Sequence, residues 1–288
     1  MKIAIASGKG GTGKTLVSTN LFYTLMQQDY EVTLVDCDAE EPNAQAFFSG
    51  FRIKSKRITQ QVPVINTDLC TYCGKCYDYC NYNAIFFLRK RKTIHVMEEL
   101  CHGCGACSIA CTKGAITEKE DELGTVNTYS ISKFSKIIES RMKVGVYTPV
   151  NVIKAAIKEA GQCPVVILDS PPGTSCPFIQ TVSQADFVIL VTEPTPFGLS
   201  DLKQSVDTLK TLSKKYGVII NKAGLGNRDV YNYLETEKIA LLMEIPFDKE
   251  VASIYSKGEI YSIFNRDWQK KFKEMVDKII NNNGDSRN

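Results

Sequence analysis

Residues 2–15 read KIAIASGKGGTGKT, and this stretch decides the fold. Its first five residues, 2–6, are an apolar run that predicts a buried strand, and a helix is expected from about Lys14 to Gln28. Between them, residues 8–15 fit the pattern G-x4-G-K-[ST] of a phosphate-binding loop. In such a loop, glycines let backbone N–H groups reach phosphate oxygens, the lysine (Lys14) reaches the β- and γ-phosphates, and the hydroxyl (Thr15) binds Mg²⁺. A glycine-rich turn without a ligand would leave Lys14 at a helix start with no purpose.

Further apolar strands follow along the chain and alternate with helical periods. The strands are expected at 31–36, 165–169, 187–192 and 217–221, and the helices at 150–160, 176–184 and 199–215. Continuous apolar strands that alternate with helices indicate a parallel sheet covered on both faces. The predicted fold class is therefore α/β in three layers.

Composition sets outer limits on the function. The chain has 288 residues, 35 basic and 32 acidic side chains and a net charge of +3, which is too small to predict nucleic-acid binding. No signal peptide is recognised, and the apolar runs are strand-sized, so a cytoplasmic protein is expected. In that reducing compartment, 11 cysteines beside only 2 histidines are better explained as metal ligands than as disulfides.

Residues 52–128 interrupt the strand–helix alternation. They contain eight of the cysteines in two similar halves, each leading into an Ala-Ile strand. We therefore predict an inserted α+β domain at 52–128 within a discontinuous α/β domain formed by 1–51 and 129–288. The basic run RIKSKR at 52–57 is explained as a solvated linker or an edge strand rather than a binding patch.

The eight cysteines form two runs with the spacing C-x2-C-x2-C-x3-C. The runs are Cys70, Cys73, Cys76, Cys80 and Cys101, Cys104, Cys107, Cys111. Three thiolates from one tight loop can hold three irons of a 4Fe-4S cluster, and Gly74, Gly103 and Gly105 would permit positive-φ turns there. Zinc is the main rival, but structural zinc sites favour two separated C-x2-C pairs.

This segment resembles a two-cluster bacterial ferredoxin across its whole length. The resemblance implies two 4Fe-4S clusters in which the fourth cysteine of each run serves the other cluster. The implied ligand sets are Cys70, Cys73, Cys76 and Cys111 for one cluster, and Cys80, Cys101, Cys104 and Cys107 for the second. Asn81 and Thr112 replace the proline that usually follows the last cysteine, which bears on cluster potential and stability. His102 is expected to be a surface residue rather than a ligand.

The extra lysine in KGGTGKT, Lys9, makes the phosphate loop resemble that of the MinD/ParA/nitrogenase iron protein class of P-loop ATPases. That resemblance implies ATP and Mg²⁺ as cofactors, and a homodimer that forms on ATP binding with Lys9 contacting nucleotide across it. The implied loop residues are Gly8, Lys9, Gly10, Gly11, Thr12, Gly13, Lys14 and Thr15.

Three more segments carry the resemblance. VDCDAEEPN (35–43) and LDSPPGT (168–174) match the two switches, so Asp38 would orient the attacking water and Asp169 would hold Mg²⁺ through water. INKAG (220–224) and IPFDKEV (245–251) match the segments around the adenine ring. The implied sets are Lys9, Lys14 and Asp38 for catalysis, Thr15, Asp38 and Asp169 for Mg²⁺, and Asn221, Pro246 and Asp248 for the nucleotide. Aspartates that merely cap loops at the end of strands are the alternative.

Three cysteines remain outside the runs. Cys37 and Cys163 are expected to be packing residues. Cys176 follows the second switch at the spacing of an interface cluster ligand in the nitrogenase iron protein, which implies a metal site at the dimer interface.

The C-terminal helix at 264–280 has an apolar stripe among lysines. We expect the stripe to pack on the sheet, with membrane contact as the alternative. The closing residues 281–288 are expected to be disordered.

Together these features predict a slow, dimer- or partner-coupled ATPase that carries iron–sulfur clusters or a metallocofactor to a client metalloprotein. One alternative is ATP-gated electron transfer from the clusters to a low-potential redox partner. The other is a nucleotide switch that positions a partner, with structural or redox-sensing clusters.

Overall fold

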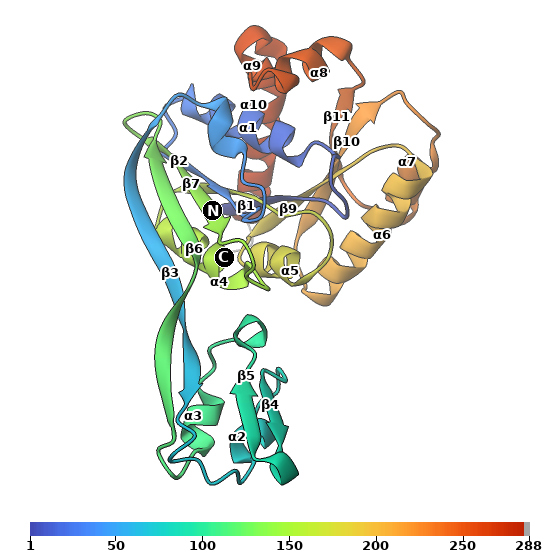
Figure 1. The fold of residues 1–288 in the computed structure, drawn as a ribbon. Coiled ribbons are helices and arrows are strands. Elements are labelled where there is room, and N and C mark those ends of the chain that lie inside the picture. Colours follow the sequence, from blue (N-terminus) through green and yellow to red (C-terminus); the bar gives the residue numbers. More distant parts are fainter. Residues whose placement is uncertain (285–288) are drawn as a thin grey trace. The chain divides into compact units, whose positions relative to one another are not determined.

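A nine-stranded sheet is the centre of the fold, in the order β11-β10-β9-β1-β8-β2-β7-β6-β3 (Figure 1). The strands pair in parallel from β11 through to β7. Their bounds are β1 Lys2–Ala6, β2 Val32–Asp36, β3 Phe51–Ile65, β6 Ile116–Ser130, β7 Ser135–Met142, β8 Val165–Asp169, β9 Phe187–Thr192, β10 Tyr216–Ala223 and β11 Leu241–Pro246. This computed structural model describes residues 1–284.

The chain divides into two compact units. The sheet unit consists of Met1–Lys56, Val126–Arg141 and the chain from Val150 onward, and the cysteine unit consists of Arg57–Thr125 and Met142–Pro149. The cysteine unit thus begins five residues after the predicted boundary at 52 and includes a second segment, 142–149, that the sequence did not assign to it.

Helices cover both faces of the sheet. Their bounds are α1 Lys14–Met26, α4 Val150–Glu159, α5 Cys176–Ser183, α6 Pro196–Thr211, α7 Asp229–Thr236, α8 Lys249–Ser256, α9 Tyr261–Phe264 and α10 Arg266–Gly284, with a 3₁₀ turn η1 at Ala44–Phe47. Helix α1 packs with α10, whereas α4 packs with α5 on the other face (Figure 1). The prediction of a three-layer α/β fold is confirmed.

The core explains why these segments form strands. Alternate side chains of the central strands, such as Ile3, Ile5 and Leu34, are buried and pack with α1 and α10 in one hydrophobic cluster. Each strand of about five residues is covered on both faces, which is why its sequence is almost continuously apolar. The sequence therefore located these strands well.

The C-terminal helix packs as expected. Trp268, Phe272, Met275, Val276 and Ile279 are buried in the cluster that also contains residues of α1, so the packing interpretation is confirmed. The expectation of disorder at 281–288 is wrong for its first part, because α10 continues to Gly284. Residues 285–288 lie outside the described residues. Within residues 1–284, no helix is both long and apolar enough to cross a membrane.

The cysteine unit repeats one local pattern. It contains α2 Lys75–Asp78, β4 Ile85–Leu88, β5 Thr93–Val96 and α3 Ala106–Ala110, with 3₁₀ turns η2 at Arg89–Arg91 and η3 at Glu98–Leu100. Each cysteine loop is followed by a short helix, α2 or α3, and then by a strand, β4 or β6, as the duplication predicted. Gly74, Gly103 and Gly105 all have positive φ, which confirms the prediction of left-handed turns beside the cysteines.

Candidate functional site

The phosphate loop joins β1 to α1 at the carboxyl edge of the sheet. Gly11 and Gly13 adopt φ of +77° and +97°, conformations that L side chains rarely adopt. A Cβ atom on Gly13 would lie only 2.3 Å from the Nδ2 atom of Asn221, so the loop has no room for a larger residue there. A Cβ atom on Gly10 or Gly11, by contrast, would have no neighbour within 4 Å, and this open space is where a phosphate group would approach the loop.

Lys14 is the first residue of α1, where the loop ends, and it is 8% exposed. Its Nζ atom donates to the Ser7 hydroxyl at 3.1 Å and to the carbonyl of Lys9 at 3.5 Å. Burial lowers the pKa of the Lys14 ammonium, while the charges of Asp169 and Asp38 act to raise it. The hydrogen bonds of the ammonium therefore go to neutral oxygens, which a negatively charged phosphate group could replace.

Two aspartates end neighbouring strands beside the loop. Asp36 and Asp169 are register partners on β2 and β8, and both are almost fully buried. Asp36 accepts three backbone N–H groups, from Asp38, Asn43 and Ala44, which fixes the first switch segment. Burial, followed by the nearby Asp169 carboxylate, raises the pKa of Asp36 well above its ordinary value.

Asp169 has the features expected of a magnesium-site carboxylate. Its Oδ2 atom accepts from the Ser18 hydroxyl at 3.0 Å, but its buried Oδ1 atom has no hydrogen-bond partner among the described residues. An unpartnered buried oxygen is costly, and a hydrated cation would satisfy it. Burial raises the pKa of Asp169 to about 6, although Lys14 and the hydroxyls of Thr15 and Ser18 lower it. The residues present therefore fit Mg²⁺.

The raised pKa of Asp169 predicts a pH dependence of stability. A carboxyl that titrates near 6 in the folded state and near 3.8 otherwise keeps its proton longer in the folded protein. Its contribution is fully present below about pH 4 and is lost as the pH rises through about 6, by roughly 3 kcal/mol. Urea unfolding without nucleotide should show a larger loss of stability with rising pH in the wild type than in Asp169→Asn, in which Asp36 is the remaining buried carboxyl with a raised pKa. Equal pH slopes in the two proteins would contradict the assignment.

The remaining switch residue, Asp38, follows Asp36 by two positions and is half-buried. Its Oδ1 atom accepts from the backbone N–H of Glu41 at 3.4 Å, and its charge acts on Lys14. Asp38 thus lies close enough to the loop to act on a molecule bound there. Its role in orienting water stays a prediction.

Lys9 forms an ion pair within its own chain. Its Nζ atom lies 3.5 Å from Oε2 of Glu193, a residue that directly follows β9. The other oxygen of Glu193 pairs with Nζ of Lys222 at 2.5 Å. Sequence reasoning did not single out Glu193 or Lys222. Glu193 directly follows β9, and Lys222 is the second-last residue of β10, so both lie at the carboxyl edge of the sheet. That position is the signal that could have found them.

Asn221 contacts the loop itself. Its Nδ2 atom donates to the carbonyl of Thr12 at 2.8 Å, and its Oδ1 atom accepts from the N–H of Lys222. The two segments predicted to surround adenine lie side by side, since Phe247 donates its N–H to the carbonyl of Ala223. Pro246 ends β11, and Asp248 caps helix α8 by accepting from the N–H of Glu250. Contact of these residues with adenine stays a prediction.

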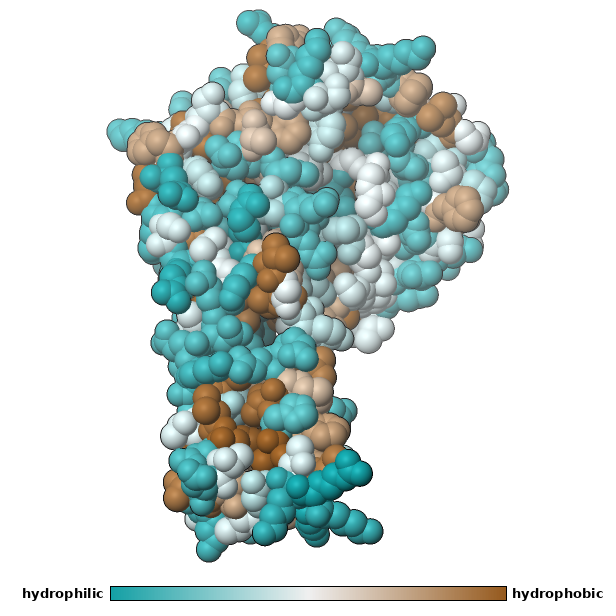
Figure 2. Space-filling view, viewed as in Figure 1, coloured by the Kyte–Doolittle hydropathy of each residue, from teal (hydrophilic) through white to brown (hydrophobic). Residues whose placement is uncertain are grey.

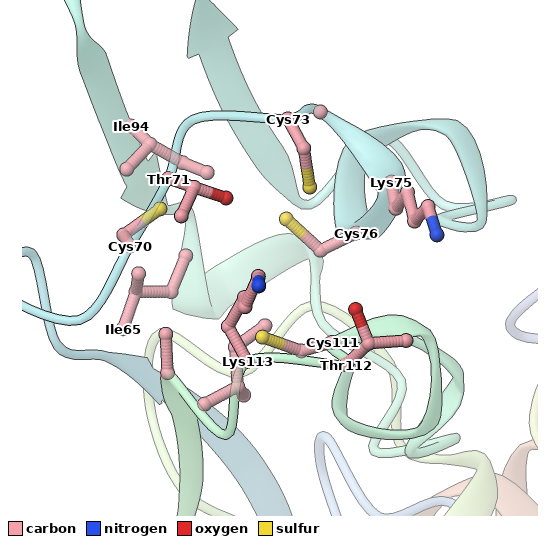
Figure 3. A pocket seen from close by; sticks show the side chains of 13 residues that line it. Ile65, Cys70, Thr71, Cys73, Lys75, Cys76, Ile94, Cys111, Thr112 and Lys113 are labelled. Atoms are coloured by element: carbon pink, nitrogen blue, oxygen red, sulfur yellow. The ribbon is translucent and has the colours of Figure 1, made fainter.

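In the cysteine unit, four cysteines from both runs line one cavity of about 400 Å³ (Figure 3). This first cavity contains Cys70, Cys73 and Cys76 from one loop and Cys111 from the other half. Figure 3 shows the sulfur atoms of all four directed toward a shared space. Cys73 is exposed and Cys76 is buried. A hydrogen bond from the N–H of Lys75 lowers the pKa of Cys73, whereas burial raises that of Cys76.

The other four cysteines line a second cavity of about 360 Å³. Its thiols are Cys80, Cys101, Cys104 and Cys107. His102 also lines it, half-buried and stacked on Tyr82 with ring centroids 3.9 Å apart. The exposed Tyr82 side chain offers an aromatic face for the imidazole.

The two cavities can be compared with the needs of a cluster and of a single ion. Among residues 1–284, no three His, Cys, Asp or Glu side chains are arranged to hold one metal ion. A cubane spreads its four thiolates farther apart than a single tetrahedral ion does. Backbone N–H groups point at sulfurs in both cavities, from Tyr72 to Cys70 and from Gly103 to Cys101, both at 3.4 Å. Four thiols around a shared cavity, with such donors, fit a 4Fe-4S cluster better than zinc.

The cysteines outside the cavities differ in exposure. Cys37 is fully buried, as expected, and burial raises the pKa of its thiol well above the ordinary value. Cys163 is half-buried rather than part of the core, with its sulfur near the carbonyls of Glu31 and Val165. Cys176 is exposed at the first residue of α5. Its role at a dimer interface stays a prediction.

The sequence did not predict the two hydroxyl groups that hydrogen-bond Lys14 and Asp169. Ser7 bonds Lys14, and Ser18 bonds Asp169. Ser18 lies four residues after Lys14, so both point from the same face of α1 toward the strand edge. That spacing is a signal that sequence reasoning could have used.

Comparison with known proteins agrees with this geometry. The family described as "CobQ/CobB/MinD/ParA nucleotide binding domain" matches residues 3–261, and the chain belongs to this family. The chain is 30% identical to "Uncharacterized protein MJ0579" of Methanocaldococcus jannaschii, over 97% of this chain and 98% of that protein. It is 25% identical to a Pyrococcus furiosus protein named "Iron-sulfur cluster carrier protein", over 97% of this chain and 85% of the relative.

Solved structures agree on the fold. The septum site-determining protein MinD of Pyrococcus horikoshii, complexed with Mg-ADP, superposes with a TM-score of 0.59 at 20% identity. The match covers 98% of each chain. At this identity the likeness shows the fold alone.

Proposed function

We propose that this chain is an ATPase that carries iron–sulfur clusters and passes them to a client metalloprotein in an ATP-dependent way. The observation that carries the proposal is the presence, in one chain of the MinD/ParA family, of a phosphate loop and two cavities each lined by four cysteines. The name of the P. furiosus relative, an iron–sulfur cluster carrier, supports it.

In the nucleotide site, each residue would act on the charge of the triphosphate. The loop N–H groups and the N-terminus of α1 would bind phosphate oxygens, and the Lys14 ammonium would stabilise negative charge on the γ-phosphate. Thr15 and Asp169 would hold Mg²⁺, which neutralises the developing charge. Asp38 would orient the attacking water.

In the cysteine unit, the cargo would be held as two 4Fe-4S clusters. Cys70, Cys73, Cys76 and Cys111 would hold one, and Cys80, Cys101, Cys104 and Cys107 would hold the other. Exposure of Cys73 and Cys104 leaves one ligand of each cavity within reach of a partner protein. A carrier needs such an accessible edge, because an acceptor thiolate must replace a donor thiolate.

A dimer that forms on ATP binding would require Lys9 to leave Glu193. We therefore expect Lys9→Ala to abolish most ATP-dependent dimerisation. The free energy of unfolding should change by less than about 1 kcal/mol, since the ion pair is partly exposed. Sedimentation with a slowly hydrolysed ATP analogue measures the dimer. Lys222→Ala is the matched control, because it removes the other cation on Glu193 without touching the loop. Unaltered sedimentation of Lys9→Ala would count against the cross-dimer role.

ATP-gated electron transfer is the second candidate, and the cysteine pairing favours it, because one ligand of each cavity comes from the other run as in ferredoxins. Labelled iron separates the two functions. A carrier loses iron to an apo-acceptor only with hydrolysable ATP, whereas an electron donor cycles its redox state without net loss of iron. A nucleotide switch would keep normal partner localisation when cluster ligands are replaced.

A further inference from the structure

The two cysteine cavities differ in the charged side chains around them. Lys75 and Lys113 line the first cavity, and the guanidinium of Arg89 donates to the carbonyl of Cys73 at 2.8 Å. Figure 3 shows Lys113 next to Cys111, and Lys75 beside Cys76 with its nitrogen directed away from the sulfurs. At the second cavity the nearby charge is acidic: Oε1 of Glu118 accepts from Ser108 and lies 3.6 Å from where a Cβ on Gly105 would be. The internal duplication has thus diverged in charge.

A basic turn extends the first rim. The β4–β5 hairpin turns through Arg89, Lys90, Arg91 and Lys92, and all four are exposed. None of these four, nor Lys75 or Lys113, forms an ion pair with a carboxylate within the described part of the chain. We call these six residues the basic rim. By contrast, Lys119 in the same unit is paired, with Glu98 at 2.8 Å.

The rim is fixed in place and flanked by apolar side chains. Arg89 lies over the ring of Phe87 at 5.9 Å, and Phe87 packs near Tyr77, so the turn is anchored to the loop that carries Cys73. Tyr77 and Leu88 are 46% and 42% exposed. On the face of the cysteine unit shown in Figure 2, hydrophobic side chains lie beside long hydrophilic ones. Arginine and aromatic side chains around an apolar centre are typical of protein interfaces.

We propose that the basic rim is the docking surface for an acidic protein, which it brings to the first cavity and not to the second. Unpaired cations attract a carboxylate-rich surface and are not neutralised by their own chain. A long polyanion such as nucleic acid, or an anionic membrane, that extended to the second cavity would also meet the carboxylate of Glu118 beside Gly105. A compact protein can cover one rim and leave the other free.

This inference rests on the proposed function for what the docked protein would receive, but binding alone tests it. The probe is a fluorescently labelled small acidic ferredoxin, and its affinity for the purified, cluster-loaded full chain is measured by anisotropy without ATP. We expect Lys90→Glu/Arg91→Glu to weaken binding by about tenfold or more, because like charges across an interface are strongly unfavourable. Wild-type binding should also weaken as salt is raised.

The matched control is Lys154→Glu/Lys158→Glu, which makes the same change of charge at two exposed positions of α4. It should bind as the wild type does. Equal loss in both variants, or in neither, would overturn the proposal. So would tighter binding of a single-stranded oligonucleotide or of anionic lipid vesicles that the rim variant abolishes. Circular dichroism and iron content confirm that the variants are folded and loaded. If binding holds but no iron is transferred, only the carrier function fails.

Discussion

Replacement of Lys14 by alanine is expected to lower the rate of ATP hydrolysis by about a hundredfold to a thousandfold or more. The Lys14 ammonium is buried in the loop, within reach of Ser7 and near the charges of Asp169 and Asp38. A preorganised charge aimed at a transferring phosphoryl group supplies several kcal/mol in a water-excluded site. Phosphate release at saturating ATP measures the effect.

The variant needs a control for folding, because removal of Lys14 also removes the cation nearest Asp169. Lys14→Met keeps the apolar length of the side chain and should give the same loss of hydrolysis. Thermal unfolding of both variants shows whether the sheet unit remains intact. Normal turnover in a folded Lys14→Ala protein would mean that the phosphate loop has another purpose.

Double cysteine replacement gives the second large effect and separates two ligand arrangements. Cys111 lies in the second run of the sequence but lines the cavity of Cys70, Cys73 and Cys76. Cys70→Ser/Cys111→Ser should therefore empty one cavity only and leave about half of the iron and sulfide. If each run held its own cluster, the same pair of changes would damage both clusters.

The reciprocal pair makes the test sharper. Cys70→Ser/Cys80→Ser damages both cavities in the structure, although both residues belong to the first run. It should therefore remove nearly all of the iron. Cys163→Ser is the matched control, since this half-buried thiol lies outside both cavities. Iron contents in the opposite order, with more iron left in Cys70→Ser/Cys80→Ser, would show that the cavities do not define the ligand sets.

The central strands and the phosphate loop could be predicted because their signals are local. The strands KIAIA and VVILD are apolar on both faces, and the glycines of the loop mark a turn that only they allow. The long strand β3 gave a weaker signal. Residues 51–57 are exposed on both sides, as expected for a strand at the edge of the sheet, and their alternation of apolar and polar residues ends after Ile53.

Parts of the site could not be predicted because they depend on contacts between distant residues. Asn221 donates to the carbonyl of Thr12 across 209 positions of sequence, and Glu193 pairs with Lys9 across a similar separation. Likewise, the different charges around the two cavities follow from where the β4–β5 turn lies. The residue types were visible in the sequence, but the neighbours that give them a role come from the topology.

Anaerobic iron and sulfide analysis with EPR, before and after ATP and an apo-acceptor, tests the central claim most directly. We expect about eight irons per chain at the start. With ATP and the acceptor, iron and sulfide should leave the protein together and appear in the acceptor, but not with Lys14→Ala. Retention of all iron, with EPR signals that change only in redox state, would contradict the carrier function.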